Sequence, residues 1–274
     1  MNDTEANEKL AKIMREQDDV GKLLVRRDLA LSRANEKLRA LDNAKSEFIS
    51  IAAHQLRTPL SAMKWILSML VNKEIGTEKE IQVFTQRALE SCERMILLVN
   101  DLLEVDHIQS GKDQFIFKPV DLNTLVQSVI QESSSKIEER KLQIHHESCE
   151  NAIVDGDAEK LRGLCQNLLE NAIKYTPVEG TIFFNIQDDD KHILMTIKDS
   201  GIGIPPEDKE RIFTKFFRAR NALRMDTVGS GLGLFIVKQI VERHGGNIRF
   251  DSDSTGTTFF VSLPKPSQLK VNPV

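Results

Sequence analysis

The sequence predicts an α+β chain of several domains: an N-terminal coiled coil, an antiparallel helical hairpin and an α/β sandwich. Apolar residues alternate in steps of three and four from residue 10 to residue 52. Two further apolar stripes are separated by a short connection that contains Gly76, and strand-like and helix-like segments alternate beyond residue 112. We therefore place the coil, the hairpin, the sandwich and a tail at residues 1–44, 45–110, 114–264 and 265–274.

The first segment is predicted to be a dimeric coiled coil with a heptad seam. The seam positions are Leu10, Ile13, Gln17, Val20, Leu24, Arg27, Leu31, Ala34, Leu38 and Leu41. Apolar residues at these positions pack between two helices, whereas the polar ones lower the stability of the coil. A seam of lower stability suits a helix that shifts. The alternative to a dimeric coiled coil is a solvated helix that packs on its own domain.

The hairpin is predicted to be half of a four-helix bundle. The apolar steps lengthen to four near residue 54, which is a stutter that locally unwinds a coil, and Pro59 bends the helix nearby. A second stripe runs from about residue 78 to residue 107. Because a single hairpin has little interior, we expect a homodimer in which a second chain completes the bundle.

Beyond residue 112 the apolar pattern alternates between the period of two that is typical of strands and the period of 3.6 that is typical of helices. Strands are predicted at 114–118, 143–146, 152–154, 181–187, 192–198, 247–251 and 257–263, and helices at 121–140, 157–175 and 232–244. Asp121 and Asp157 are the expected N-caps of the first two helices. A long charged segment, 204–228, lies between the predicted strand at 192–198 and the predicted helix at 232–244. A segment of this length predicts a lid over a ligand.

Composition excludes several classes of partner and compartment. A net charge of −4 and the lack of a basic stretch argue against nucleic acid, and no apolar run is long enough to span a bilayer. The first ten residues lack the apolar core of a signal peptide. Three widely spaced cysteines indicate neither disulfides nor zinc, so a reducing, cytoplasmic location is expected.

His54 is the candidate nucleophile of the hairpin. The apolar stripe centred between Ala52 and Leu56 points away from His54, so the imidazole is expected to face solvent. A neutral imidazole is a good nucleophile near pH 7, and Thr58, one turn on, could orient a water. Taken alone, an exposed histidine is usually an ordinary surface residue.

Two polar clusters in the sandwich could bind a nucleotide. Asn167, Asn171 and Lys174 share one helical face, where amide oxygens suit Mg²⁺ and the ammonium suits a phosphate. Asp199 directly follows an apolar strand, where its carboxylate could accept a hydrogen bond from an amine such as that of adenine. Gly201 and Gly203 would let the backbone approach the base. Surface amides and an ordinary turn are the alternatives.

A third cluster consists of three glycines, Gly229, Gly231 and Gly233, that open a predicted helix. Backbone N–H groups at a helix N-terminus can meet a phosphate. The spacing is neither the dinucleotide fingerprint nor a P-loop, so Rossmann and P-loop folds are poor explanations.

In their order along the chain these segments resemble the sensor histidine kinases of two-component signalling, over about residues 45–264. The matching motifs are the phospho-acceptor box around His54, the N box at 167–177, the glycine boxes at 199–203 and 229–234 and the phenylalanine box at 211–218.

The resemblance implies a dimerisation and phosphotransfer hairpin followed by an ATP-binding domain of the gyrase and Hsp90 type. Asn167 and Asn171 would hold Mg²⁺, Lys174 and Tyr175 the phosphates and ribose, and Asp199 the adenine. The further ATP-binding positions would be Gly201, Gly203, Phe213, Arg218, Gly229, Gly231, Leu232 and Gly233.

The resemblance also implies an activity and partners. His54, with Gln55 and Thr58 as catalytic neighbours, would attack the γ-phosphoryl group of Mg-ATP and pass it to an aspartate of a response regulator. The N-terminal coil resembles the helix that joins such cores to an upstream sensor, and we expect no sensor within these residues.

Gln55 departs from the family pattern, which usually has an acidic residue after the histidine. An amide oxygen can fix the tautomer but carries no charge to stabilise an imidazolium, so slower autophosphorylation is expected. Three alternatives remain open: a degenerate kinase acting mainly as a regulator phosphatase, an ATPase that does not phosphorylate histidine, and a coiled-coil scaffold.

Overall fold

The computed structural model describes residues 3–72, 77–110, 115–225 and 229–266. The chain divides into two compact units, Met1–His54 and Gln55–Val274, which are described separately. The predicted connection around Gly76, the boundary at 111–113 and most of the tail lie outside the described residues.

Helix α1 (Asp3–Val71) is continuous and provides the described part of the first unit. Within it, the seam residues Leu31 and Leu38 are 61% and 63% exposed. Leucines this exposed favour a partner helix over a helix buried on its own domain. The dimeric coiled coil stays a prediction.

The second unit begins with a helical hairpin, as predicted. Helix α2 (Glu78–Ser110) follows α1, and the rings of Trp65 and Phe84 meet edge to face with centroids 6.1 Å apart. A capping box starts α2, because Thr77 Oγ1 accepts from the Glu80 N–H and Glu80 Oε2 accepts from the Thr77 N–H. Pro59 lies inside α1 without ending it.

The α/β sandwich has a five-stranded sheet in the order β2-β4-β5-β7-β6, in which only β2 and β4 pair in parallel. Its strands are β2 (Gln143–Glu147), β4 (Thr181–Asp189), β5 (His192–Asp199), β6 (Asn247–Asp253) and β7 (Gly256–Pro264). A separate ribbon pairs β1 (Lys118–Asp121) with β3 (Ile153–Gly156).

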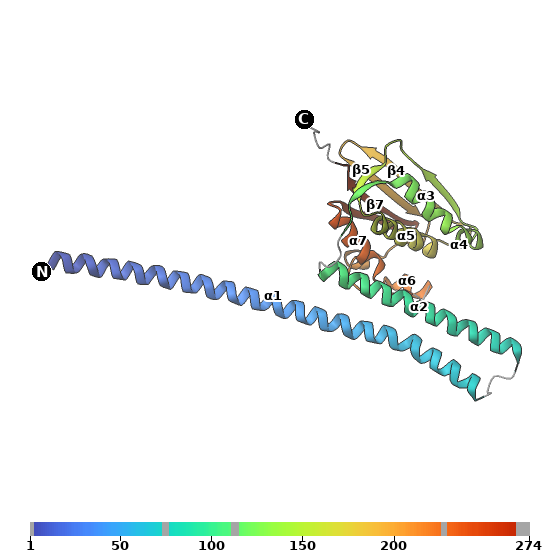
Figure 1. The fold of residues 1–274 in the computed structure, drawn as a ribbon, viewed down its shortest axis with the longest axis horizontal. Coiled ribbons are helices and arrows are strands. Elements are labelled where there is room, and N and C mark those ends of the chain that lie inside the picture. Colours follow the sequence, from blue (N-terminus) through green and yellow to red (C-terminus); the bar gives the residue numbers. More distant parts are fainter. Residues whose placement is uncertain (1–2, 73–76, 111–114, 226–228, 267–274) are drawn as a thin grey trace. The chain divides into compact units, whose positions relative to one another are not determined.

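Helices cover one face of this sheet (Figure 1). They are α3 (Leu122–Glu132), α4 (Ser134–Glu139), α5 (Ala158–Tyr175) and α7 (Gly233–Arg243), while η1 (Pro206–Arg211) and α6 (Arg220–Met225) belong to the lid segment. Buried residues alternate along the central strands, among them Ile182, Phe184, Ile193, Met195, Ile197 and Val261. This period of two is what one covered face requires.

Three sequence-based details were wrong. The expected strand at 114–118 begins only at Lys118, because Phe115 and Phe117 instead pack on His244 at 5.4 and 5.1 Å. The expected helix at 121–140 is interrupted at Ser133, whose N–H ends α3 by bonding the carbonyls of Val129 and Ile130. The lid segment, expected as a loop, contains η1 and α6.

Candidate functional site

The acidic end of the site is Asp199, the last residue of β5. Its side chain is 7% exposed, and its Oδ1 accepts hydrogen bonds from the N–H groups of Gly201 at 2.8 Å and Thr257 at 3.2 Å. Burial raises the pKa of Asp199 to about 6, although these two hydrogen bonds lower it in part. Both described hydrogen bonds reach Oδ1, so Oδ2 is suited to accept from a ligand.

The turn after Asp199 allows only glycine at two positions. A Cβ at Gly201 would lie 2.6 Å from the carbonyl oxygen of Tyr175, where the chain passes the end of α5. Gly203 has φ +63°, and a Cβ there would overlap the carbonyl of Asp253. The loop is thus held against both α5 and the end of β6, while the predicted approach of its backbone to a base stays a prediction.

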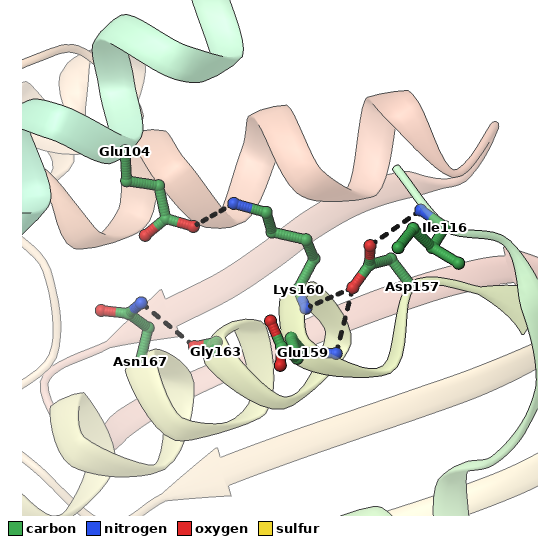
Figure 2. A network of polar contacts seen from close by, with 7 residues as sticks. All are labelled: Glu104, Ile116, Asp157, Glu159, Lys160, Gly163 and Asn167. Carbon is green, nitrogen blue, oxygen red and sulfur yellow. Dashed lines mark hydrogen bonds and ion pairs between the residues drawn. The ribbon is translucent and has the colours of Figure 1, made fainter. Parts of the chain in front are cut away.

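Helix α5 presents the amide and ammonium groups. Figure 2 shows how the helix begins: Asp157 accepts from the N–H groups of Glu159, Lys160 and Ile116. Further along, Asn167 Nδ2 donates to the carbonyl of Gly163 at 3.1 Å, which orients the side chain. Asn167, Asn171, Lys174 and Tyr175 are all half-buried on this helix.

The second glycine segment comes close to the same helix. A Cβ at Gly233 would lie 2.7 Å from Asn167 Oδ1, and one at Gly229 would lie 3.1 Å from Lys174 Nζ. Arg218 donates from its guanidinium to the carbonyl of Gly229 at 3.4 Å. The structure therefore gathers two cationic side chains, an amide and the glycine backbone into one place, which suits a polyphosphate.

Around the glycines, other predicted residues have packing roles. Leu232 is fully buried and precedes α7, and its N–H donates to Ser230 Oγ at 3.1 Å. Gly231 has φ +71° and faces the backbone of Phe216, where a Cβ would lie 2.7 Å from the carbonyl carbon. Phe213 packs instead against Phe250 and Phe259, with centroids 5.8 and 6.5 Å away, so its nucleotide contact stays a prediction.

Sequence reasoning missed three residues of this site: Thr257, Ser230 and Asn221. Thr257 faces Asp199 across the antiparallel β5–β7 pair, and strand register is not visible in a local pattern. Ser230 Oγ donates to Asp101 of α2 at 2.6 Å, although Ser230 lies inside a motif that was identified. Asn221 of α6 bonds the backbone of the turn after Asp199.

The candidate nucleophile lies in α1. His54 and Thr58 are exposed, as the apolar stripe predicted, and Gln55 is half-buried. His54 closes the first unit, and the residues of the candidate nucleotide site belong to the second. An exposed imidazole on a helix is open to reaction with a group carried to it.

The raised pKa of Asp199 predicts how nucleotide binding depends on pH. A carboxylate accepts a hydrogen bond from an amine better than its protonated form, so ATP affinity should rise as pH increases through about 6. The stability contribution of Asp199 has the opposite trend. Because its folded-state pKa is raised, that contribution is complete below about pH 4 and is lost as pH rises through about 6.

Titration calorimetry with ADP between pH 5 and pH 8 measures this dependence. A terminal phosphate also titrates near pH 6, so Asp199→Asn is the matched control that keeps the phosphate effect and removes the carboxylate. An equally steep pH profile in the wild type and in Asp199→Asn would show that Asp199 does not bind the base.

The constellation thus lies in an α/β sandwich that follows a helical hairpin, and an exposed histidine lies in the first helix. Residues 156–267 match the histidine kinase-, DNA gyrase B- and HSP90-like ATPase family, and residues 44–111 match the His Kinase A (phospho-acceptor) domain. The chain belongs to the sensor histidine kinases.

Similar proteins agree with this assignment. The chain is 33% identical over 240 residues to the circadian input-output histidine kinase CikA of Synechococcus elongatus, and 33% identical over 232 residues to the sensor histidine kinase WalK of Bacillus subtilis. The matches cover 86% and 82% of this chain, but only 32% and 37% of those relatives.

Solved structures of the histidine kinase ThkA are also similar. Its catalytic domain is 30% identical, with 55% of this chain and 98% of that domain covered and a TM-score of 0.49. ThkA in complex with the response regulator protein TrrA is 25% identical, with 80% and 61% covered and a TM-score of 0.61. Within the described ranges, every helix is too short or too polar to pass through a lipid bilayer.

Proposed function

We propose that the protein is a two-component autokinase that transfers the γ-phosphoryl group of ATP to His54 and then to an aspartate of a response regulator. The observation that supports this proposal is that the turn after Asp199 and the second glycine segment both meet α5: a Cβ at Gly201 would lie 2.6 Å from the Tyr175 carbonyl oxygen, and one at Gly229 would lie 3.1 Å from Lys174 Nζ. The same chain carries an exposed histidine within its phospho-acceptor match.

Each part of the site has a chemical task. The Asp199 carboxylate accepts from the exocyclic amine of adenine, while Gly201 lets the base approach the backbone. Lys174 and Arg218 lie beside Gly229 and neutralise phosphate charge, and backbone N–H groups at the start of α7 add further donors. Tyr175, at the end of α5, would contact the ribose, as the family resemblance implies.

The donor set fits a magnesium ion brought in with the nucleotide. Among the described residues, no group of three or more His, Cys, Asp or Glu side chains could hold a metal ion. Asn167 uses its Nδ2 to bond Gly163, and Asn167 Oδ1 together with Asn171 would supply neutral oxygens. When bound, Mg²⁺ supplies charge neutralisation at the phosphates.

The transfer step forms one bond and breaks one. The lone pair of an imidazole nitrogen of His54 attacks the γ-phosphorus, and the bond to the β–γ bridging oxygen breaks with ADP as leaving group. The other ring nitrogen carries the proton, which Gln55 can hold through its amide oxygen until it is lost to solvent. Transfer to a carboxylate of the regulator then frees His54.

Incubation of the purified chain with γ-³²P-labelled ATP and Mg²⁺ tests the proposal. The expected product is a label that is lost in acid and kept in alkali, as a phosphoramidate requires, and that moves to a purified receiver domain on mixing. Steady release of phosphate without labelled protein would favour an ATPase that does not phosphorylate histidine.

The neighbour of His54 sets the expected rate. We predict that Gln55→Glu raises the initial autophosphorylation rate about 10- to 100-fold, because a carboxylate stabilises the developing imidazolium better than an amide. Initial ³²P incorporation at saturating ATP measures this rate. Lys64→Ala, at an exposed position of the same helix, is the control for an altered helix surface, and an unchanged or lower rate in Gln55→Glu would refute the explanation.

We also propose a phosphatase activity toward the phosphorylated regulator. The exposed Thr58, one helical turn after His54, has a hydroxyl that can orient a water for attack on an acyl phosphate. Together with Gln55 it favours, as the second candidate, a degenerate kinase that acts mainly as a phosphatase. Release of the label from the regulator as inorganic phosphate, in the presence of ADP, would favour the phosphatase over the autokinase.

A homodimer is the proposed assembly. Large apolar side chains remain exposed on the hairpin, although such patches are rare on monomers. They are Leu60, Trp65, Leu67, Val71, Ile81, Val83, Leu89, Ile96, Leu97, Val99 and Leu103. A four-helix bundle formed by two chains would bury those that share the apolar face, such as Ile81 and Val99, and a monomer in sedimentation equilibrium at the assay concentration would contradict this assembly.

A further inference from the structure

The side chain of Asn221 joins the lid segment to the turn that follows Asp199. Asn221 lies in α6, and its Nδ2 donates to the carbonyls of Gly203 at 2.8 Å and Ile202 at 3.2 Å. Its Oδ1 accepts from the N–H of Ala222 at 2.9 Å. The opposite amide orientation would set an oxygen against two carbonyl oxygens, so the donor assignment follows from the chemistry of the three partners.

Within the described residues, the hydrogen bonds given to these two carbonyls come from Asn221, and the other bonds of the turn use its N–H groups. The Ile202 N–H donates to Tyr175 at 3.2 Å, and the Ile204 N–H donates to Ser252 Oγ at 2.8 Å. Gly203 is buried, so a carbonyl there that loses its donor is deprived of water as well. Asn221 satisfies both carbonyls with the two hydrogens of one amide group.

The helix that carries Asn221 is itself anchored. Asp208, which is 5% exposed, accepts the N–H of Arg220 at its Oδ2 over 3.0 Å, and Ala222 is 8% exposed. Eight residues after Asn221 the chain reaches Gly229, at the cationic end of the site. Asn221 therefore connects the base side of the nucleotide site with the segment that leads to its phosphate side.

We infer that Asn221 is a positioning residue for nucleotide binding: its amide group holds the turn after Asp199 in the conformation that receives the base. This inference rests on the proposed nucleotide site. A turn held in its binding conformation loses less conformational entropy when the ligand binds, so the contact increases affinity for every nucleotide that carries adenine. Asn221 need not touch the ligand for this effect.

Two substitutions separate the donor role from simple packing. Asn221→Asp has nearly the same shape and keeps the acceptor for the Ala222 N–H, but it sets a carboxylate against two carbonyl oxygens. Asn221→Leu keeps the volume and removes both polar functions. Leu223→Ala, at a 47% exposed position of the same helix, is the matched control.

The measurements are the Kd of ADP and of ATP by calorimetry, the KM and kcat of autophosphorylation, and the Tm without nucleotide. Loss of two hydrogen bonds predicts a Kd about tenfold higher in both Asn221 variants. The factor should be equal for ADP and ATP, because the contact lies on the base side. KM should rise by the same factor, kcat at saturating ATP should stay within about twofold, and Leu223→Ala should match the wild type.

The outcomes separate this inference from the proposed function. If the wild type binds no ADP, the nucleotide site itself is wrong. If Asp199→Asn loses affinity while both Asn221 variants bind like the wild type, the site stands and the role of Asn221 is refuted. A loss confined to ATP, or a fall in kcat alone, would also refute it, because Asn221 would then act on the phosphates or on the transfer step.

Discussion

His54→Ala is expected to reduce acid-labile phosphorylation of the chain to the background of the assay, a loss of more than about 100-fold. A methyl group has no lone pair to attack phosphorus, and none of the residues proposed to bind nucleotide is altered. The Kd of ADP should therefore equal that of the wild type. Filter binding after labelling, with parallel acid and alkali washes, measures the first quantity, and calorimetry measures the second.

The control for this substitution is a second exposed helical histidine. His107 lies near the end of α2 and is exposed like His54, so His107→Ala should keep the wild-type label. If His54→Ala retained label, the phospho-acceptor would be a different residue. If it retained full phosphate release instead, the chain would be an ATPase whose helices serve only to dimerise.

Much of the fold could be predicted from the sequence because helix caps and apolar periodicity depend only on nearby residues. The N-cap at Asp157, the alternation along β4 and β5 and the apolar stripe of α2 all depend on neighbours within a few residues. The wrong strand at 114–118 shows the limit of this reasoning. Phe115 and Phe117 alternate as a strand would, but their two rings pack on His244, which is more than a hundred residues away in sequence.

The residues of the candidate site could largely be predicted from the sequence, whereas the contacts between them could not. Asp199 and the glycines could be found because a carboxylate after an apolar strand and glycines before a helix each have few physical explanations. Asn221 could not, since its partners are backbone carbonyls 18 and 19 residues away. Nor could the approach of Gly233 to Asn167, which depends on how α5 and α7 pack.

Gly203→Ala is expected to weaken ADP binding more than about 100-fold and to lower the free energy of unfolding by roughly 2–4 kcal/mol. At φ +63° an alanine is strained, and its Cβ would overlap the carbonyl of Asp253. The turn must move to relieve the overlap, and the Gly203 carbonyl then leaves Asn221. Urea unfolding measures the stability, and calorimetry measures the affinity.

Gly163→Ala is the matched control for this change, because it adds the same methyl group in the same domain. Gly163 lies within α5 and a Cβ there would meet nothing within 4 Å. Alanine should raise stability there by about 0.5–1 kcal/mol, since glycine loses more backbone freedom in a helix. ADP affinity should be kept, because the Gly163 carbonyl that orients Asn167 is unchanged. Wild-type ADP affinity in Gly203→Ala would instead mean that this turn does not receive the base, and the nucleotide would have to bind without Asp199.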